Sequence, residues 1–249
     1  MKVIGIIPSR YASTRFLGKP LALLGGKPVV QWVYEKAEAV LDEVYVATDD
    51  ERIAKCVEEF GGKAVMTGPC KSGTDRCYEA FKQINENCDV IVNIQGDEPF
   101  IHISQLMDIK ACFSDKKTQI ATLVQPFTSS DGLSALENPN SPKVVFDKDG
   151  FALYFSRSII PYLRGIAKEK WLDQHTFYKH IGLYAYRPLV LKELTALPQS
   201  SLELAESLEQ LRWIENGYKI KVAVTLESTI GIDTPEDLQH AEDYLKNHE

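Results

Sequence analysis

The stretch that decides the fold reads Ile7-Pro8-Ser9-Arg10-Tyr11-Ala12-Ser13-Thr14-Arg15-Phe16-Leu17-Gly18-Lys19-Pro20. A short apolar run at residues 3–7 leads into it and is typical of a buried strand, and an amphipathic stretch at residues 29–41 follows it and predicts a helix. Three fixed cations, Arg10, Arg15 and Lys19, lie between the two elements. A basic loop after the first strand of an α/β sheet is where a polyanion such as a nucleoside triphosphate would bind.

This basic loop is not a Walker phosphate loop, which requires Gly, four residues and then Gly-Lys-Ser/Thr. Here Gly18-Lys19 is followed by Pro20, and no Gly-x-Gly-x-x-Gly occurs anywhere in the chain. If phosphates bind, Arg and Lys side chains would hold them more than a glycine nest would. An ordinary solvated surface loop is the alternative interpretation.

The composition is that of a globular protein with a sizeable core, in one large domain or two small ones (249 residues, 44% hydrophobic). A net charge of −7 argues against nucleic acid or an anionic membrane as the main partner, and makes the basic loop a local exception. The 5 cysteines contain no Cys-x-x-Cys pair and are interpreted as reduced, mostly buried thiols of a cytoplasmic protein. No apolar run approaches the ~20 residues that a membrane span needs.

Strand and helix signals alternate through residues 1–125, which predicts a mostly parallel twisted sheet with helices on both faces. Further strands are expected at residues 43–48, 63–67, 89–94 and 120–124, and further helices at 51–60, 72–86 and 104–113. After Gln125 the rhythm breaks. Asp147-Lys148-Asp149-Gly150 predicts a hairpin, and residues 180–186 alternate like another strand, which together indicate an antiparallel insertion.

The α/β pattern resumes at Ser200, which can cap a helix with Glu203. That helix is expected to continue to Gly217, with an apolar stripe at Leu204, Leu208, Leu211 and Ile214. A strand is expected at 219–224, and Thr234-Pro235 begins a last helix. We therefore expect one α/β domain over 1–249, in which 1–125 and 200–249 form a nucleotide-binding core and 126–199 form the insertion.

Two aspartates are candidates to hold Mg²⁺. Asp97 lies just beyond a central strand, where open α/β sheets bind ligands, and Asp233 lies in a tight turn before a helix. Mg²⁺ takes oxygen ligands and usually needs one or two carboxylates plus substrate phosphates. Structural roles are the alternative for both residues, and helix capping is the specific alternative for Asp233.

Two further groups of residues could bind a ligand. Ser72-Gly73-Thr74-Asp75-Arg76 joins a helix N-terminus to a guanidinium, which suits a phosphate or a base carbonyl, although plain helix capping is the alternative. Arg157, His180 and Tyr184 lie in the aromatic insertion and suit a hydroxylated, carboxylated sugar or a protein interface. No Gly-x-Ser-x-Gly elbow supports a serine hydrolase.

The motifs, in this order, resemble the 3-deoxy-manno-octulosonate cytidylyltransferases (CMP-Kdo synthetases) over nearly the whole chain. The matching blocks include 7–15, Gly18-Lys19-Pro20-Leu21, 72–76, Val92-Asn93-Ile94-Gln95-Gly96-Asp97-Glu98-Pro99, 152–157, 180–187, Leu208-Glu209-Gln210-Leu211-Arg212 and 231–238. The chain departs from the family at Phe16-Leu17, where Leu-Pro is usual, and this exchange leaves Arg15 and Lys19 in place.

The resemblance implies a nucleotide-diphospho-sugar transferase-like fold and an Mg²⁺-dependent enzyme that joins CTP to 3-deoxy-manno-octulosonate (Kdo) for lipopolysaccharide assembly. It implies that Asp97 and Asp233 hold Mg²⁺, and that Arg10, Lys19 and Asp97 act in catalysis. By the same resemblance CTP is bound by Ser9, Arg10, Arg15, Lys19, Ser72, Arg76 and Gln95. Kdo is bound by Arg157, His180, Tyr184, Glu209 and Gln210. A homodimer that pairs through the insertion is also implied.

Three rival functions stay open. The nearest is a cytidylyltransferase for another 2-keto sugar acid, sialic acid or an amino-Kdo. A metal-dependent glycosyltransferase of similar fold would also place an Asp after a central strand, but it would not need three cations in its first loop. A catalytically dead nucleotide sensor would not need both Asp97 and Asp233.

Overall fold

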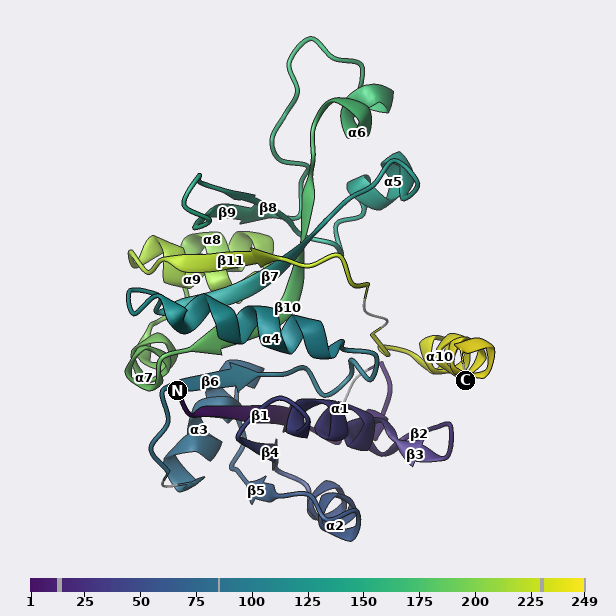
Figure 1. Cartoon of the computed structure of the whole chain (residues 1–249), viewed down its shortest axis with the longest axis vertical. Coiled ribbons are helices and arrows are strands. Elements are labelled where there is room, and N and C mark those ends of the chain that lie inside the picture. The colour runs from purple at the N-terminus through teal and green to yellow at the C-terminus, as the bar shows by residue number, and fades with distance from the viewer. Residues whose placement is uncertain (13–14, 85, 229–230, 249) are drawn as a thin grey trace. The chain divides into compact units, whose positions relative to one another are not determined.

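The computed structural model of the chain describes residues 1–12, 15–84, 86–228 and 231–248, and it divides into two compact units (Figure 1). The first unit comprises residues 1–107, 187–195 and 228–249, and the second comprises 108–186 and 196–227. Ser13 and Thr14 of the basic loop, and Asn85 near the end of a predicted helix, lie outside the described residues. The boundaries between these units differ from those expected at residues 125 and 199. The expectation of one domain over 1–249 stays a prediction.

The first unit contains a parallel sheet with β1 at its centre. β1 (Val3–Ser9) lies between β4 (Glu43–Thr48) and β6 (Val90–Asn93), and β5 (Ala64–Met66) follows β4 at the edge. These strands are almost continuously apolar because helices cover both faces of a parallel sheet. The strands predicted in this half of the chain are confirmed, with ends shifted by a few residues.

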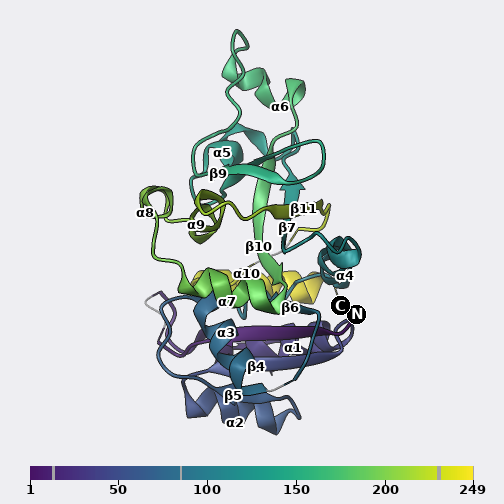
Figure 2. The ribbon, with the colours of Figure 1, turned by 90° about the vertical axis from the view of Figure 1, so that its left-hand side faces the viewer.

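Three crossover helices join the strands of this sheet. α1 (Val29–Glu38) connects β1 to β4, α2 (Glu51–Glu59) connects β4 to β5, and α3 (Gly73–Ile84) connects β5 back to β6. Because parallel crossovers are right-handed, α1 and α2 cover one face, and α3 covers the other when the chain reverses its direction across the sheet. In Figure 2, α3 lies on the viewer's side of β1 and β4.

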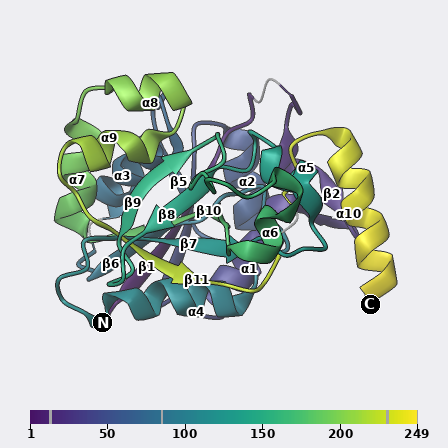
Figure 3. The ribbon, with the colours of Figure 1, turned by 90° about the horizontal axis from the view of Figure 1, so that it is seen from above.

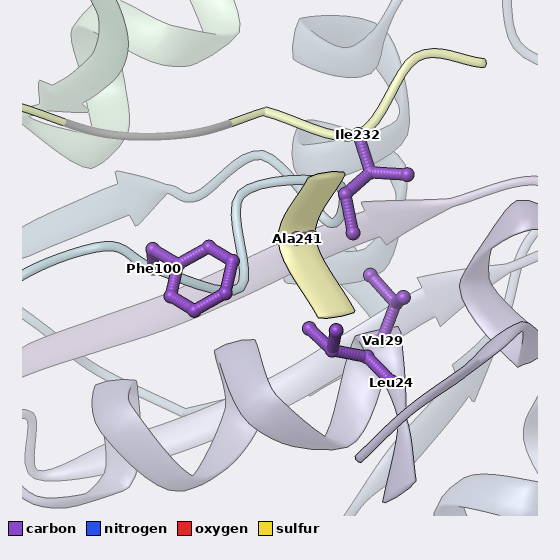
Figure 4. Packing of buried hydrophobic residues seen from close by; sticks show 5 residues of the cluster. All are labelled: Leu24, Val29, Phe100, Ile232 and Ala241. Atoms are coloured by element: carbon purple, nitrogen blue, oxygen red, sulfur yellow. The ribbon is translucent and has the colours of Figure 1, made fainter. Parts of the chain in front are cut away.

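The last helix, α10 (Pro235–His248), belongs to the first unit. Its predicted start is confirmed, because Asp237 N–H donates to Thr234 Oγ1 at 3.2 Å and Thr234 N–H donates to Asp237 Oδ2 at 2.9 Å. The helix is packed in a buried cluster near β2 (Leu23–Leu24) and its short partner β3 (Lys27–Pro28). The cluster is shown in Figure 4 and consists of Leu24, Val29, Phe100, Ile232 and Ala241.

The second unit contains a mixed sheet. β7 (Ile120–Pro126) pairs in parallel with β11 (Ile220–Val224) and antiparallel with β10 (Tyr178–Tyr186). β10 also pairs antiparallel with β8 (Lys143–Phe146), which forms a hairpin with β9 (Ala152–Ser156). The predicted fold class, a mostly parallel α/β sheet with an antiparallel insertion, is therefore confirmed.

One predicted helix is wrong. The expected continuous helix from Ser200 to Gly217 is two helices, α8 (Ser201–Glu206) and α9 (Glu209–Glu215), which Figure 3 shows as separate. Ser207 breaks the helix with φ 51°, a left-handed conformation. Leu204 consequently leaves the apolar stripe and is 62% exposed, while Leu208 and Leu211 are buried. The Ser200–Glu203 capping box is confirmed.

The remaining helices include α4 (Ile103–Ala111), which confirms the helix expected at 104–113, and several others for which no helix was expected. The others are α5 (Gly132–Glu137), α6 (Trp171–Gln174), α7 (Pro188–Ala196) and the 3₁₀ turns Lys19–Leu21, Cys112–Ser114 and Lys168–Lys170. Among the described residues, no helix combines the length and the apolar character needed to cross a membrane. All five thiols are free, but Cys77 alone is fully buried, so the expectation of mostly buried cysteines is wrong.

Candidate functional site

The basic loop of the first unit is fixed at its base by backbone and ring contacts. Gly18 has φ 69° and donates its N–H to Tyr11 O at 2.9 Å. A Cβ at Gly18 would lie 2.9 Å from the Tyr11 ring, so this position requires glycine. The Arg52 guanidinium stacks on the same ring at 3.3 Å and is itself held by Asp50 at 2.7 Å. These contacts fix the backbone of the loop next to Lys19 and so position the Lys19 side chain.

The Lys19 side chain reaches both predicted metal ligands. Its Nζ lies 2.6 Å from Asp97 Oδ2 and 3.1 Å from Asp233 Oδ1, with the side chain 12% exposed. Arg15 Nη1 lies 2.9 Å from Asp233 Oδ2 but is 65% exposed. We call the space between the Asp97 and Asp233 carboxylates the carboxylate seat.

The fold brings the two aspartates together although they lie far apart in sequence. Ile232 is completely buried in the cluster of Figure 4, and its N–H donates to Asp97 O at 2.8 Å. Asp233 follows Ile232 directly. On the other side, a Cβ at Gly96 would lie 2.8 Å from Ser9 Oγ, so glycine lets the chain after β6 approach the end of β1. The buried side chain of Ile232 and the close backbone approach at Gly96 therefore position the two carboxylates.

The side chain of Asp233 does not cap α10. Thr234 and Asp237 complete the cap of α10, and Asp233 contributes its backbone N–H to Asp237 Oδ2 at 3.0 Å. The Asp233 carboxylate contacts Lys19 and Arg15 instead. The carboxylate of Asp233 is therefore not part of the cap of α10 and pairs with the two cations instead.

A polar cavity of about 290 Å³ in the first unit brings together every residue predicted for CTP and metal. It is lined by Pro8, Ser9, Arg10, Arg15, Lys19, Pro20, Cys70, Lys71, Ser72, Gly73, Arg76, Gln95, Gly96, Asp97 and Asp233. Sequence reasoning missed Lys71, whose position beside Ser72 could have indicated a fourth cation. The cavity is suited to a polyanion because its basic side chains outnumber its acidic ones.

Two of the predicted nucleotide contacts also have structural partners. The buried Arg76 guanidinium donates to Thr67 Oγ1 and to Asp49 Oδ2, both at 2.6 Å. Ser72 Oγ accepts the Asp75 N–H at 3.1 Å, so the predicted capping of α3 by Ser72 is present. Capping and cavity lining occur together at this helix N-terminus, and the role of both side chains toward a nucleotide stays a prediction.

Glu98 is an acidic neighbour that sequence reasoning missed, although it follows Asp97 directly. Burial, together with the negative charges of Asp97 and Asp233, raises the pKa of Glu98 to about 7. A cation in the carboxylate seat would oppose this rise, because it would favour the ionised form of the carboxyl group.

His180 in the second unit is held as a neutral ring. A register shift in β10 between Ile181 and Tyr184 places the Thr122 hydroxyl 2.9 Å from Leu183 O and 3.1 Å from His180 Nε2. Since Thr122 has one proton and a carbonyl can only accept it, Nε2 carries the hydrogen and donates to Thr122. Burial lowers the pKa of His180 to about 3, so Nδ1 is an acceptor at neutral pH.

The rings in contact with the His180 ring are those of Phe155 and Tyr184. The Tyr184 ring lies 5.2 Å from the His180 ring and 5.1 Å from the Trp213 ring, between centroids. Burial raises the pKa of Tyr184 well above its ordinary value, so its hydroxyl stays protonated. Gln210 is 4% exposed, and within the described part of the chain its Nε2 has no hydrogen-bond partner. A buried donor without a partner is costly, which favours a polar ligand here.

Arg157 and Glu209, also predicted for the sugar, have protein partners. Arg157 donates from Nε to Glu206 O at 2.6 Å, from Nη1 to Pro139 O at 2.8 Å and from Nη2 to Ser207 O at 3.1 Å. Glu209 Oε1 accepts from Arg212 Nη2 at 2.9 Å. Arg157 thus fixes the left-handed turn before α9, and a direct contact with a sugar carboxylate stays a prediction.

The chemistry of the carboxylate seat fits a hard divalent cation. Two carboxylate oxygens converge on one ammonium nitrogen, so a cation already lies where a metal would be bound. Across the residues that the structure describes, no cluster of three or more His, Cys, Asp or Glu side chains could hold a metal by itself. Two carboxylates completed by substrate phosphates and water is the usual arrangement for Mg²⁺.

Fold and cavity together define an α/β protein with a polyanion site beside paired carboxylates, and the sequence profile of the cytidylyltransferase family matches residues 4–220. A 3-deoxy-manno-octulosonate cytidylyltransferase from Phocaeicola vulgatus is 68% identical, covering 100% of this chain and 99% of the relative. Another from Porphyromonas gingivalis is 55% identical, covering 99% and 97%. The chain belongs to the family of 3-deoxy-manno-octulosonate cytidylyltransferases.

Solved structures agree with this assignment. A CMP:2-keto-3-deoxy-manno-octonic acid synthetase complexed with CTP matches with a TM-score of 0.92 and 38% identity over 100% of both chains. A 4-diphosphocytidyl-2C-methyl-D-erythritol synthase from Anaerococcus prevotii matches with a TM-score of 0.61 and 17% identity, covering 98% of this chain and 99% of that one. The second likeness concerns the fold alone.

Proposed function

We propose that this protein transfers the cytidylyl group of CTP to Kdo, giving CMP-Kdo and pyrophosphate for lipopolysaccharide assembly. The observation that carries the proposal is the cavity in which Lys19 meets Asp97 and Asp233 beside Arg10 and Arg15. The names of relatives that align over the whole chain support the choice of CTP and Kdo.

In this proposal the basic loop binds the triphosphate. Arg10, Arg15 and Lys19 hold its phosphates and stabilise the charge that develops on the departing pyrophosphate. Transfer requires the anomeric hydroxyl of Kdo to lie in line with the α-phosphorus, so positioning and charge stabilisation supply most of the catalysis. Ser9, Ser72, Arg76 and Gln95 line the same cavity and surround the nucleotide.

Asp97 and Asp233 would hold Mg²⁺ in the carboxylate seat. When bound there, the ion would neutralise phosphate charge and lower the pKa of a nearby hydroxyl. A cation between the two carboxylates would also favour the ionised form of Glu98, because the charges of Asp97 and Asp233 help to raise its pKa.

Kdo would be bound by residues of the second unit. Gln210 offers a buried amide donor, Tyr184 a protonated hydroxyl and His180 a neutral ring acceptor. Uncharged donors and acceptors suit sugar hydroxyls, whereas Arg157 and Glu209 are the charged groups proposed for the carboxylate end and its neighbouring hydroxyls. We further propose that the protein acts in the cytoplasm as a homodimer that pairs through residues 126–199.

The test is an assay of pyrophosphate release with CTP, Kdo and Mg²⁺. We expect release that depends on all three. Sialic acid and an amino-Kdo, offered separately, distinguish the rival sugar acids. UTP should be a weaker substrate and ATP should be excluded, because a site built for a pyrimidine cannot easily admit a purine and leaves polar groups unpaired with uracil. Absence of pyrophosphate release would contradict the proposal and favour a glycosyltransferase or a binding protein.

A further inference from the structure

The Lys19 ammonium lies between the Asp97 and Asp233 carboxylates, in the carboxylate seat. Its nitrogen lies within 3.1 Å of one oxygen from each aspartate, and the Lys19 side chain is largely shielded from solvent. A divalent cation bound to the same two oxygens would occupy the same space. An ammonium and a metal ion at this distance would also repel each other strongly. The two cations therefore compete for one position.

A polyphosphate changes this competition in two ways. Its phosphates give Lys19 a new anionic partner in the cavity that Lys19 lines. They also supply further oxygen ligands for a metal, which two carboxylates alone lack. Without nucleotide, the protein offers a metal two carboxylates, and the single positive charge of Lys19 already offsets part of their negative charge. With nucleotide, both obstacles are removed.

We propose that Lys19 is a placeholder cation: it keeps divalent metal out of the carboxylate seat until a polyphosphate draws its ammonium away. Metal then binds with or after the nucleotide, and by linkage each ligand strengthens the binding of the other. This inference rests on the proposed metal role of Asp97 and Asp233, and it adds an order of binding that the proposed reaction does not require.

Arg15 provides an internal comparison. It contacts the other Asp233 oxygen at 2.9 Å, forms no ion pair with Asp97 among the described residues, and is 65% exposed. An exposed ion pair of this kind is weak because water screens it. Removing the Arg15 charge should therefore change the metal affinity of the nucleotide-free protein much less than removing the Lys19 charge.

The experiment measures Mn²⁺ binding to the nucleotide-free protein from the electron paramagnetic resonance signal of free Mn²⁺. We expect the parent to bind weakly and Lys19→Met to bind at least ~10-fold more tightly, equivalent to about 1.4 kcal/mol. Lys19→Arg, which keeps the charge, should stay near the parent, and Arg15→Met should show a smaller gain than Lys19→Met. Lys27→Met removes a lysine that pairs with Glu35 elsewhere and should change nothing.

A second measurement does not depend on Mn²⁺. Without Lys19 the two carboxylates repel each other, so Lys19→Met should melt at a lower temperature than the parent in the absence of metal. Mg²⁺ should restore more of the melting temperature of Lys19→Met than it adds to the parent, since a ligand of the folded state stabilises it by mass action. Circular dichroism establishes that the variant folds, and Lys19→Gln replaces it if it does not.

The outcomes separate the placeholder role from the metal site. Equal Mn²⁺ affinities of parent and Lys19→Met would overturn the placeholder role. The metal assignment would survive that result under one condition. With CTP present, the parent would have to bind more Mn²⁺ than CTP alone binds, and Asp97→Asn would not. Tight Mn²⁺ binding that persists in Lys19→Met/Asp97→Asn would show that the metal lies elsewhere, which overturns both. Tight binding by Lys19→Met that Asp97→Asn removes supports both.

Discussion

The candidate sites of the two units differ in the charge of the side chains that form them. In the first unit, Lys19, Asp97 and Asp233 carry full charges, and the fold compensates each charge with another at 3.1 Å or less. In the second unit, His180 and Gln210 are neutral, Gln210 is buried, and the ring of His180 is held by a threonine hydroxyl. A site for a polyanion is balanced by ions, whereas a site suited to sugar hydroxyls consists of hydrogen-bonding groups removed from water.

The difference has a consequence for how each site tolerates change. Partly exposed ions are screened, so their loss affects a bound charged ligand more than the fold. Buried neutral groups are part of the core, so their protonation or removal affects the fold as well.

The largest effect is expected for Asp97→Asn. If Asp97 holds the metal that acts in the transition state, its loss should lower kcat at least ~10²-fold, with the circular dichroism spectrum unchanged. Steady-state pyrophosphate release over a Mg²⁺ titration measures it. Activity within a few-fold of the parent would contradict the metal role of Asp97.

His180 should make the stability of the protein fall in acid. Its folded pKa of about 3 lies below its unfolded value, so the unfolded state binds more protons between the two values. The stability that neutral His180 contributes is complete above pH ~6.5 and is lost as the pH falls, by at most about 1.4 kcal/mol per pH unit.

Urea unfolding of the parent and of His180→Gln between pH 4.5 and 7.5 measures this dependence. The variant should show a flatter profile than the parent. His175→Gln is the matched control, because His175 is exposed and its removal should leave the profile unchanged. Parallel profiles of parent and His180→Gln would contradict the buried neutral ring.

Gln210→Ala should weaken sugar binding selectively. Losing one hydrogen bond to a neutral sugar group costs about 1 kcal/mol, which corresponds to a rise in the KM for Kdo of roughly five-fold. The KM for CTP should not change. Melting temperature serves as the control for folding, and an equal rise in both KM values would contradict a role of Gln210 in the sugar site.

The smallest effect is expected on the stability of Asp233→Asn. The cap of α10 is complete without the Asp233 carboxylate, and the pairs with Lys19 and Arg15 are partly exposed. The free energy of unfolding should therefore change by less than about 1 kcal/mol, while kcat falls strongly if Asp233 is a metal ligand. A destabilised variant with near-parental kcat and Mg²⁺ dependence would assign Asp233 a structural role.

The same contrast explains what the sequence could predict. The βαβ rhythm and the charges of the first cavity are visible because strand ends, glycines and fixed charges have sequence signatures, so the residues proposed for CTP do line one cavity. The break at Ser207 was missed because a serine in a left-handed conformation has no local signal. It is stabilised by tertiary contacts, such as the Arg157 bond to Ser207 O.

Thr122 illustrates the same limit in the second unit. Its hydroxyl meets His180 only because β10 shifts register against β7, and hydrophobic alternation does not reveal such a shift. Glu98 was missed for a different reason. It lies within the motif at residues 92–99, but its environment depends on Asp233, which lies more than a hundred residues away in sequence.

The bond from Ile232 N–H to Asp97 O also bears on how the protein is made. A ribosome adds the basic loop and Asp97 to the chain more than a hundred residues before it adds Ile232 and Asp233. A nascent or prematurely terminated chain therefore carries the cations and one acid without the second acid and its anchor. If Asp233 holds the metal as proposed, chemistry at this site would begin only after the segment that carries Ile232 and Asp233 has docked on Asp97.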